Sequence, residues 1–520
     1  MTLTVNEFEV DDDGLSALLV PRDDMLLEAE ESPGVFGLGQ GPFERYRREV
    51  VATPIAGTDR HHVTETIDWE LAIPIWGPLF RPLVRRQTRR SEAPRLLGPD
   101  ESPPSSPWWS PPARLDARAA RILSLLCGLS MLAGYLGTVI TQTITYAATE
   151  FHTSTGDQGN ALGAIRLGVI FSMVLMVASD RRGRVGLLRL CAIGGTVTAA
   201  AGALSPNLWT LAGTQTVSRA FSTALALLIT VVAAEEMPAG GRAYAASVLT
   251  MTAALGAGGA VLLIPVADFG VAAWRITYVA PLLVLPWFLG IIRRLPESQR
   301  FVRPHGKATM AGHRGRLGLL CTTSFFGLMF LAPVSQFQND FLRTEHAFTG
   351  LGIAIFTIGI NTPGGIGIVV GGKLADIRGR KLIGAIGTLG GGAFLVLGYQ
   401  VGGPLLWVTW IVGTIIAAMC VPALAVYGPE LFPTALRGRA NGYITLAGVG
   451  GGLVGLVAVG HLRDHFHRYG PAFAALGFCP LVVAGVVLIF YPETAHLELE
   501  ELNPEDSAGA LAMVPGTSAA

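Results

Sequence analysis

The sequence predicts an all-α membrane protein with twelve transmembrane helices in two six-helix pseudo-repeats, preceded by a soluble N-terminal extension. Half of its 520 residues are hydrophobic and only 15% are charged, whereas a soluble domain has roughly 25% charged residues. After residue 119, apolar stretches follow one another, each long enough to cross a bilayer as a helix of roughly 20 residues. Three short motifs occur twice, at offsets of 196, 195 and 196 residues, which predicts two related halves.

These features divide the chain into a soluble region, a linker, a first half, a central loop, a second half and a tail. The expected boundaries are residues 1–93, 94–113, 119–292, 293–316, 317–491 and 492–520. The formal net charge is zero, so nothing in the composition favours a nucleic-acid partner, and none is expected.

The soluble region ends in a predicted strand and a basic helix. From Thr66 to Ile73, apolar and polar residues alternate, which predicts a strand with one buried face. From Trp76 to Arg90, apolar residues accompany several arginines. Such a helix lies either on an anionic membrane surface or on its own domain with a solvated basic face. The strand and helix are similar to the end of a START-like lipid-binding domain, which implies contact with the membrane surface or with lipid.

The twelve spans are expected to be helical, because lipid offers no hydrogen-bond partner to backbone amides. They are predicted at residues 119–147, 158–178, 186–204, 209–234, 243–267, 273–292, 317–339, 348–372, 382–400, 405–429, 441–461 and 471–490. Basic residues are distributed unequally between the loops that join them. With the N-terminus inside, sixteen arginines and lysines lie in inner loops and four in outer loops. The positive-inside rule therefore predicts a multi-pass protein of the inner or plasma membrane with both termini in the cytoplasm.

The first doubled motif follows the second and eighth spans. The run from Asp180 to Arg184 recurs as the run from Asp376 to Arg380. A carboxylate and arginines at helix ends can pair across the inner seam in one conformation and separate in another; the alternative is an ordinary positively charged loop. The segment from Gly372 to Lys381 resembles the loop signature of the major facilitator superfamily.

The second doubled motif lies at the inner ends of the fourth and tenth spans, and a third follows the sixth and twelfth. Glu235, Pro238 and Arg242 recur as Glu430, Pro433 and Arg437, and the third motif is Pro296-Glu297-Ser298, recurring as Pro492-Glu493-Thr494. Proline ends the helix, and the arginine can reach back to the acid. Both motifs resemble the sugar-porter and organic-ion-porter branches of that superfamily. The expected gate residues are Asp180, Arg181, Arg184, Asp376, Arg380, Glu235, Arg242, Glu430 and Arg437.

Two arginines lie inside the predicted spans. Arg166 precedes Asp180 by 14 residues and Arg219 precedes Glu235 by 16, which places them about 21 and 24 Å from the inner face. An arginine at that depth is costly unless it faces a cavity or a partner, so each is either a substrate ligand or a structural group bonded to backbone carbonyls. Without an obvious acid nearby, the pair favours an anionic or carboxylate-bearing substrate.

Other polar side chains within the spans are further candidates for substrate binding. Each alone is more often a hydrogen bond between helices. They are Tyr135, Gln142, Gln336, Gln338 and Asn361.

The sequence thus predicts a secondary transporter that moves a small polar or anionic metabolite by alternating access. Proton coupling stays open, because the first span has no acid before Glu150. The alternatives are a drug or metabolite efflux porter and a non-transporting membrane sensor that signals through the extension. No enzyme motif, metal cluster or phosphate-binding loop is recognisable, so neither catalysis nor a cofactor is expected.

Overall fold

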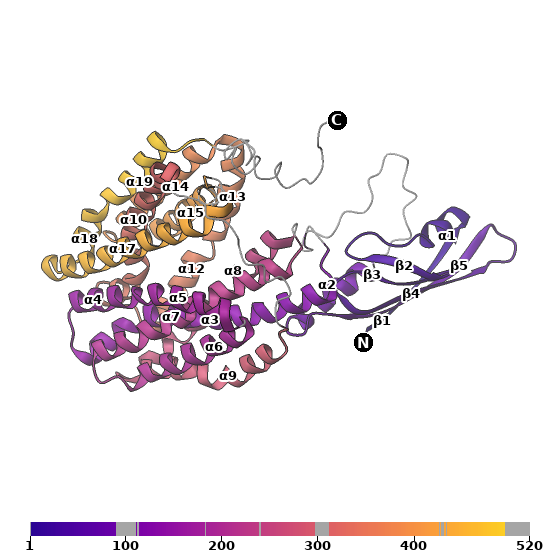
Figure 1. Cartoon of the computed structure of the whole chain (residues 1–520), viewed down its shortest axis with the longest axis horizontal. Coiled ribbons are helices and arrows are strands. Elements are labelled where there is room, and N and C mark those ends of the chain that lie inside the picture. The colour runs from indigo at the N-terminus through magenta and orange to yellow at the C-terminus, as the bar shows by residue number, and fades with distance from the viewer. Residues whose placement is uncertain are drawn as a thin grey trace, which may run out of the picture.

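The computed structural model describes residues 2–89, 111, 114–182, 184–238, 241–296, 311–425, 427, 431–432 and 434–493. Nearly all of the predicted linker and tail, and much of the central loop, lie outside these residues. The described part forms a sheet domain (residues 2–89) and a helical bundle (residues 114–493), which lie end to end (Figure 1). We call the end of the bundle beside the sheet domain the domain end, and the opposite end the distal end.

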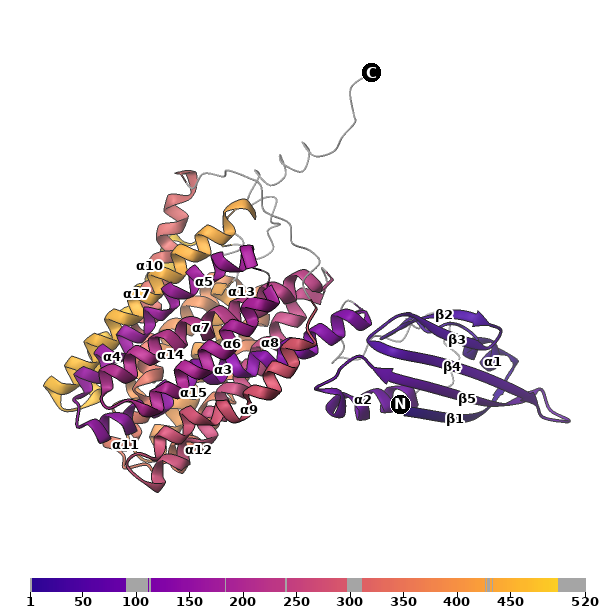
Figure 2. The same cartoon turned by 60° about the horizontal axis from the view of Figure 1, so that its bottom comes forward.

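The sheet domain is a five-stranded antiparallel sheet with strand order β1-β5-β4-β3-β2, spread out in Figure 2. Its elements are β1 (Thr2–Asp11), α1 (Asp12–Leu18), β2 (Leu27–Ser32), β3 (Val35–Gln40), β4 (Phe43–Pro54), β5 (Arg60–Leu71) and α2 (Gly77–Arg89). The predicted strand overlaps the end of β5, where alternate residues Ile67 and Trp69 are buried, as a one-sided sheet requires. The other four strands were not predicted.

Helix α2 corresponds to the predicted basic helix and packs on the sheet. Val84 is buried in the same cluster as Ile67 and Trp69, while Arg81 and Arg85 are exposed. The helix therefore has an apolar face on its own domain and a basic face turned outward.

The first half of the bundle contains six membrane spans, all built from predominantly apolar sequence. Its elements are α3 (Ala117–Phe151), α4 (Thr155–Arg166), α5 (Gly168–Arg182), α6 (Arg184–Ala201), η1 (Gly202–Leu204), α7 (Leu208–Glu236), α8 (Arg242–Leu262), η3 (Ile264–Phe269), η4 (Ala273–Arg275) and α9 (Ile276–Arg293).

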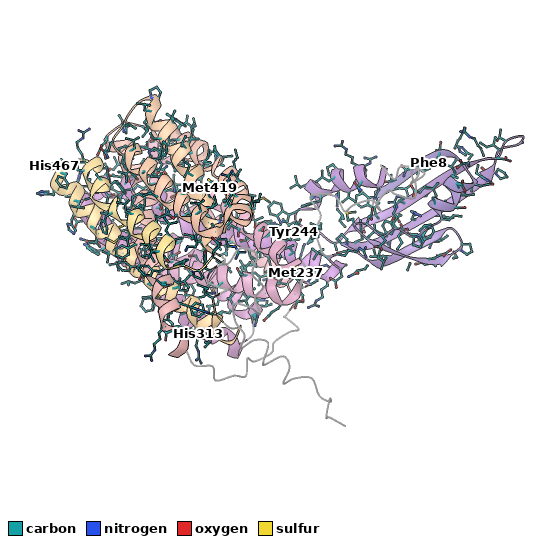
Figure 3. The ribbon with its side chains drawn as sticks, turned by 90° about the horizontal axis from the view of Figure 1, so that it is seen from above. Phe8, Met237, Tyr244, His313, Met419 and His467 are labelled. Atoms are coloured by element: carbon teal, nitrogen blue, oxygen red, sulfur yellow. The ribbon has the colours of Figure 1, made fainter. Side chains whose placement is uncertain are left out.

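The second half repeats this layout. Its elements are η5 (Ala311–His313), α10 (Arg314–Gln336), α11 (Gln338–Thr344), α12 (Gly350–Asn361), α13 (Gly364–Arg378), α14 (Arg380–Gly398), α15 (Pro404–Ala425), α17 (Thr434–Phe466), α18 (Tyr469–Leu476) and α19 (Phe478–Phe490). Within the described residues, twelve helical segments are long and apolar enough to cross a membrane, which confirms the predicted number. Figure 3 shows Tyr244 at the domain end and His467 at the distal end.

The second and eighth spans are each broken near the middle at equivalent positions. Helices α4 and α5 are separated at Leu167, and α12 and α13 are separated at Thr362 and Pro363. Pro363 follows Leu167 by 196 residues, the offset of the doubled motifs. The repeat therefore extends to the local helix geometry, although both spans were predicted as continuous helices.

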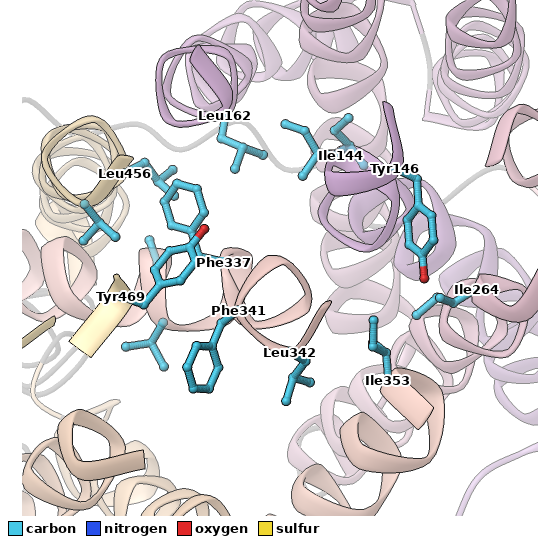
Figure 4. Packing of buried hydrophobic residues seen from close by; sticks show 14 of the residues in the cluster. Ile144, Tyr146, Leu162, Ile264, Phe337, Phe341, Leu342, Ile353, Leu456 and Tyr469 are labelled. Carbon is cyan, nitrogen blue, oxygen red and sulfur yellow. The ribbon is translucent and has the colours of Figure 1, made fainter. Parts of the chain in front are cut away.

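The two halves share a hydrophobic core toward the distal end. Leu162 of α4 and Leu456 of α17 belong to it, as do Ile264 of η3 and Ile353 of α12. Figure 4 shows these side chains converging from both halves. The halves meet here mainly through two helix pairs, the second span with the eleventh and the fifth with the eighth.

Candidate functional site

Arg166 and Arg219 lie at the break in the second span. Arg166 ends α4, and Gly168 begins α5 directly beside Arg219 of α7. A Cβ on Gly168 would clash with the carbonyl oxygen of Thr216 and lie 2.9 Å from the Cβ of Arg219, so only glycine permits this approach. The break and the glycine together bring the two arginine-bearing helices into contact.

The two guanidinium groups have few protein partners. Nη1 of Arg219 donates to the carbonyl oxygen of Gly137 on α3 at 2.5 Å. The Nε atoms of Arg166 and Arg219 are both buried without a hydrogen-bond partner among the described residues. The two residues are neighbours, because Gly168, two residues after Arg166, packs against the Cβ of Arg219, and like charges at short range repel each other. Such a pair of donors is incompletely satisfied and is stabilised by an added anion.

Arg166 also reaches the other half of the bundle. A Cβ on Gly452 of α17 would lie 2.7 Å from Nη1 of Arg166 and 3.2 Å from its Nε. The guanidinium group therefore lies flat against the backbone of α17, at the seam between the halves. A ligand held by Arg166 would contact both halves, which is the position that alternating access requires.

The remaining predicted binding residues have partners within the protein or lie apart from the arginines. The hydroxyl of Tyr135 donates to the carbonyl oxygen of Thr277 at 2.5 Å, and Nε2 of Gln338 donates to Oγ1 of Thr357 at 2.9 Å. Nδ2 of Asn361 donates to the backbone of its own helix. Gln336 is half-buried at the end of α10. These contacts are structural, and a substrate role for these side chains stays a prediction.

Gln142 helps to join the two halves of the bundle. Its side-chain oxygen accepts from Nδ2 of Asn339 at 2.9 Å, and this bond joins α3 of the first half to α11 of the second. Gln142 was predicted as a substrate ligand, so the contact adds a second, structural role for this side chain in the conformation observed.

Two further carboxylates close the distal end. Asp464 of α17 accepts from the backbone amides of Thr155 at 3.1 Å and Gly156 at 2.6 Å, capping the start of α4. Asp268 of η3 accepts from the amide of Gly350 at 2.7 Å, at the start of α12. Each bond crosses between the halves at a helix N-terminus, where a negative charge is favoured.

Two contacts of the predicted gate residues can be described, and each lies within one half. Arg184 at the start of α6 forms an ion pair with Glu235 at the end of α7. In the second half, Glu493 accepts from the backbone amides of Arg380 at 2.9 Å and Lys381 at 3.3 Å. Glu430 lies outside the described residues, and so do the side chains of Asp180, Arg181, Arg242, Asp376 and Arg437. These two described contacts lie within the halves, and the contacts described above between the halves lie toward the distal end.

The hydrogen bonds that join the halves were not predicted. No motif marks Asp464, and Asn339 is recognisable in the sequence only as a polar residue near the end of the seventh span. Gly452 lies against Arg166 and leaves room for its guanidinium group. Only contact across the seam distinguishes these residues.

The architecture is that of a polytopic membrane protein with two related six-helix halves and a polar site at their seam. The family profile described as Major Facilitator Superfamily matches residues 125–455 and 317–512. The chain belongs to the major facilitator superfamily, and is thus a membrane transporter by family. No curated protein matches the sequence significantly.

Several solved structures share this fold. The inward open conformation of the xylose transporter XylE from E. coli superimposes with a TM-score of 0.63 at 18% identity, covering 74% of this chain and 99% of that one. The nucleoside transporter NupG gives a TM-score of 0.59 at 12% identity, with 71% and 100% covered. A bacterial homologue of the human lysosomal transporter Spinster, inward-facing and unoccupied, gives 0.57 at 15%, with 77% and 99% covered. At these identities the likeness concerns the fold alone.

Proposed function

We propose that the chain is a secondary active transporter of a small organic anion, such as a carboxylate-bearing metabolite, and that Arg166 and Arg219 bind it. The observation that carries the proposal is the pair of neighbouring arginines at the seam, each with a buried Nε that has no partner among the described residues. The substrate would be recognised by charge and by paired hydrogen bonds.

An anion would remove the unfavourable features of this site. It would pair with two mutually repelling cations and supply acceptors to unsatisfied donors. A neutral polyol could accept the hydrogen bonds but would leave the repulsion unchanged. The site therefore favours a carboxylate over a neutral sugar, despite the fold shared with a xylose transporter.

In the proposed transport cycle, the contacts between the two halves alternate between two arrangements. We place the domain end in the cytoplasm, because the loops there carry the excess of basic residues. The conformation described then has its outer end closed by the bonds of Asp464, Asp268 and Asn339. Transport requires these contacts to break while new ones form at the domain end.

The substrate class can be tested with purified full-length protein. Mono- and dicarboxylates, sugar phosphates and neutral sugars are screened for thermal stabilisation, and the best ligand is then assayed for uptake into proteoliposomes. We expect a carboxylate to stabilise the protein and Arg219→Lys to weaken its binding about 10- to 100-fold, because lysine keeps the charge but loses the paired donors. Arg219→Ala is expected to abolish uptake.

The matched control is Arg189→Lys, since Arg189 is an exposed arginine on α6 away from the seam. Wild-type uptake by Arg219→Ala, or stabilisation by neutral sugars alone, would contradict the proposal. Saturable binding without flux in any direction would favour the sensor instead. Comparison of flux with and without an imposed pH gradient decides whether a proton accompanies the substrate.

A further inference from the structure

An apolar pocket lies between the sheet domain and the bundle, far from the arginine pair. Its volume is about 170 Å³. The sheet domain contributes Trp76 and Leu79, α3 contributes Leu123, and α8 contributes Val248 and Met251. Nothing in the proposed transport cycle uses this pocket.

The pocket lies where the bundle enters the membrane. Its α3 and α8 residues lie in the domain-end parts of the first and fifth spans, between Ala120 and Cys127 and between Tyr244 and Leu255. Met251 is 60% exposed and Leu79 is 62% exposed, so the apolar lining continues onto the outer surface of the molecule. A pocket of this kind opens toward the hydrocarbon of the adjacent leaflet rather than toward water.

The junction that forms the pocket is well packed. Ile75 donates its backbone amide to Oγ of Ser124 at 3.3 Å, and its side chain, with that of Ile291, would meet any Cβ placed on Gly128. Ala72 is buried in the core of the first half. The walls of the pocket are therefore fixed, which favours a defined occupant.

The basic residues beside the pocket fall into two groups. At the start of α3 the arginines are paired with acids of the protein: Arg114 with Asp23, and Arg121 with Glu44 at 2.7 Å. Helix α2 carries arginines and no acid, and Arg81 next to the lining residue Phe80 is exposed. The α2 arginines are thus available to a negatively charged headgroup at the membrane surface.

We propose that this pocket binds an anionic phospholipid, with an acyl chain among Trp76, Leu123 and Val248 and the headgroup at Arg81 and Arg85 of α2. The apolar lining gives affinity for the acyl chain, and the exposed basic face of α2 favours a negatively charged headgroup. Bound in this way, the lipid joins the sheet domain to the first and fifth spans.

Tryptophan quenching by brominated lipids tests the proposal directly, because Trp76 lines the pocket. Full-length protein is reconstituted in phosphatidylcholine vesicles with increasing fractions of brominated phosphatidylglycerol or brominated phosphatidylcholine. The Trp76 signal is taken as the difference between wild type and Trp76→Phe. We expect it to saturate at a roughly tenfold lower fraction of phosphatidylglycerol than of phosphatidylcholine.

Two variants test separately whether the pocket binds the acyl chain and whether α2 recognises the headgroup. Val248→Phe fills the pocket and should abolish quenching of Trp76, whereas Val284→Phe on the exposed face of α9 should not. Arg81→Glu with Arg85→Glu should remove the preference for phosphatidylglycerol, whereas Arg45→Glu with Arg47→Glu on β4 should preserve it.

Three results would overturn the proposal. Equal quenching by both lipids would identify ordinary boundary lipid, and absence of Trp76 quenching would exclude an acyl chain from the pocket. If neither Val248→Phe nor the charge reversal on α2 released the bound lipid, the lipid would bind elsewhere.

Discussion

At the scale of single residues, Asp340 is the most unusual carboxylate of the bundle. It lies on α11, beyond the predicted hydrocarbon-spanning part of α10, and is 3% exposed. The hydroxyl of Tyr469 donates to it, and Arg463, Arg343 and Thr145 also favour its charged form. Burial outweighs them and raises the pKa of Asp340 above its ordinary value.

The raised pKa of Asp340 predicts a pH dependence of stability. A group whose folded-state pKa lies above its unfolded-state pKa stabilises the protein at low pH, and this contribution is lost as the pH rises through the folded-state pKa. We expect the melting temperature of Asp340→Asn to fall less steeply with rising pH than that of the wild type, measured on full-length protein in detergent. Asp59→Asn, which changes an exposed acid of the sheet domain, should leave that slope unchanged. An unchanged slope in Asp340→Asn would contradict this account.

The sequence located the arginine pair but not the surroundings of the pair. Depth could be counted along a helix from Asp180 and Glu235, so Arg166 and Arg219 were recognised as internal charges. Their proximity to each other depends on the break at Leu167 and on Gly168, neither of which has a distinctive pattern. Likewise, no sequence feature indicates that Gln142 meets Asn339, because the two are 197 residues apart.

At the scale of elements, the contact between α4 and α17 closes the distal end. Its anchor is the carboxylate of Asp464 on the first amides of α4. Hydrogen bonds to a charged group contribute about 1.5–3 kcal/mol. Removing the anchor should therefore shift the equilibrium toward a distally open conformation by about tenfold or more.

Labelling of a buried seam residue measures this shift. Leu162→Cys places a thiol in the core shared by the halves, where the leucine is 1% exposed. We expect Asp464→Ala to raise the rate of thiol labelling from the distal side about tenfold, and Asp464→Asn, which keeps one acceptor, to have a smaller effect. Equal labelling rates in all three backgrounds would show that Asp464 does not hold the seam.

Elements were predicted best where lipid restricts the choice. Twelve spans and two halves followed from hydrophobic length and from the doubled motifs, since every spanning segment has to be helical. The sheet domain was predicted poorly, because strands such as β2 and β3 are short and only weakly alternating. In α2, the buried Val84 and the exposed arginines fit a helix packed on its own domain with a solvated basic face, while contact of that face with a membrane stays a prediction.

At the scale of the whole molecule, the two halves are expected to rock about the site at the arginine pair. The second and eleventh spans are antiparallel and in register: Gly156 faces His461, Gly163 faces Leu453 and Arg166 faces Gly452. Continuing that register toward the domain end places Val174 opposite Gly442. In this conformation Val174 is 67% exposed, and a Cβ on Gly442 would meet nothing within 4 Å.

This register predicts a conformation-dependent cross-link. In a background in which the five native cysteines are replaced, Val174→Cys with Gly442→Cys should form a disulfide only in the conformation closed at the domain end. Formation should increase with Asp464→Ala, and reduction should restore transport. The single-cysteine variants serve as controls. Rapid cross-linking in the distally closed conformation would contradict the proposed movement.

The attachment of the sheet domain has a mechanical consequence. Its contacts through Ala72, Ile75 and Trp76 are with α3, α8 and α9, all in the first half. The sheet domain therefore moves together with the first half. A small rotation about the arginines becomes a larger displacement of the strands that lie farthest from the bundle. A partner that bound the edge strand β2 and preferred one position of the sheet domain would favour one conformation of the bundle, so transport would be regulated from outside the bilayer.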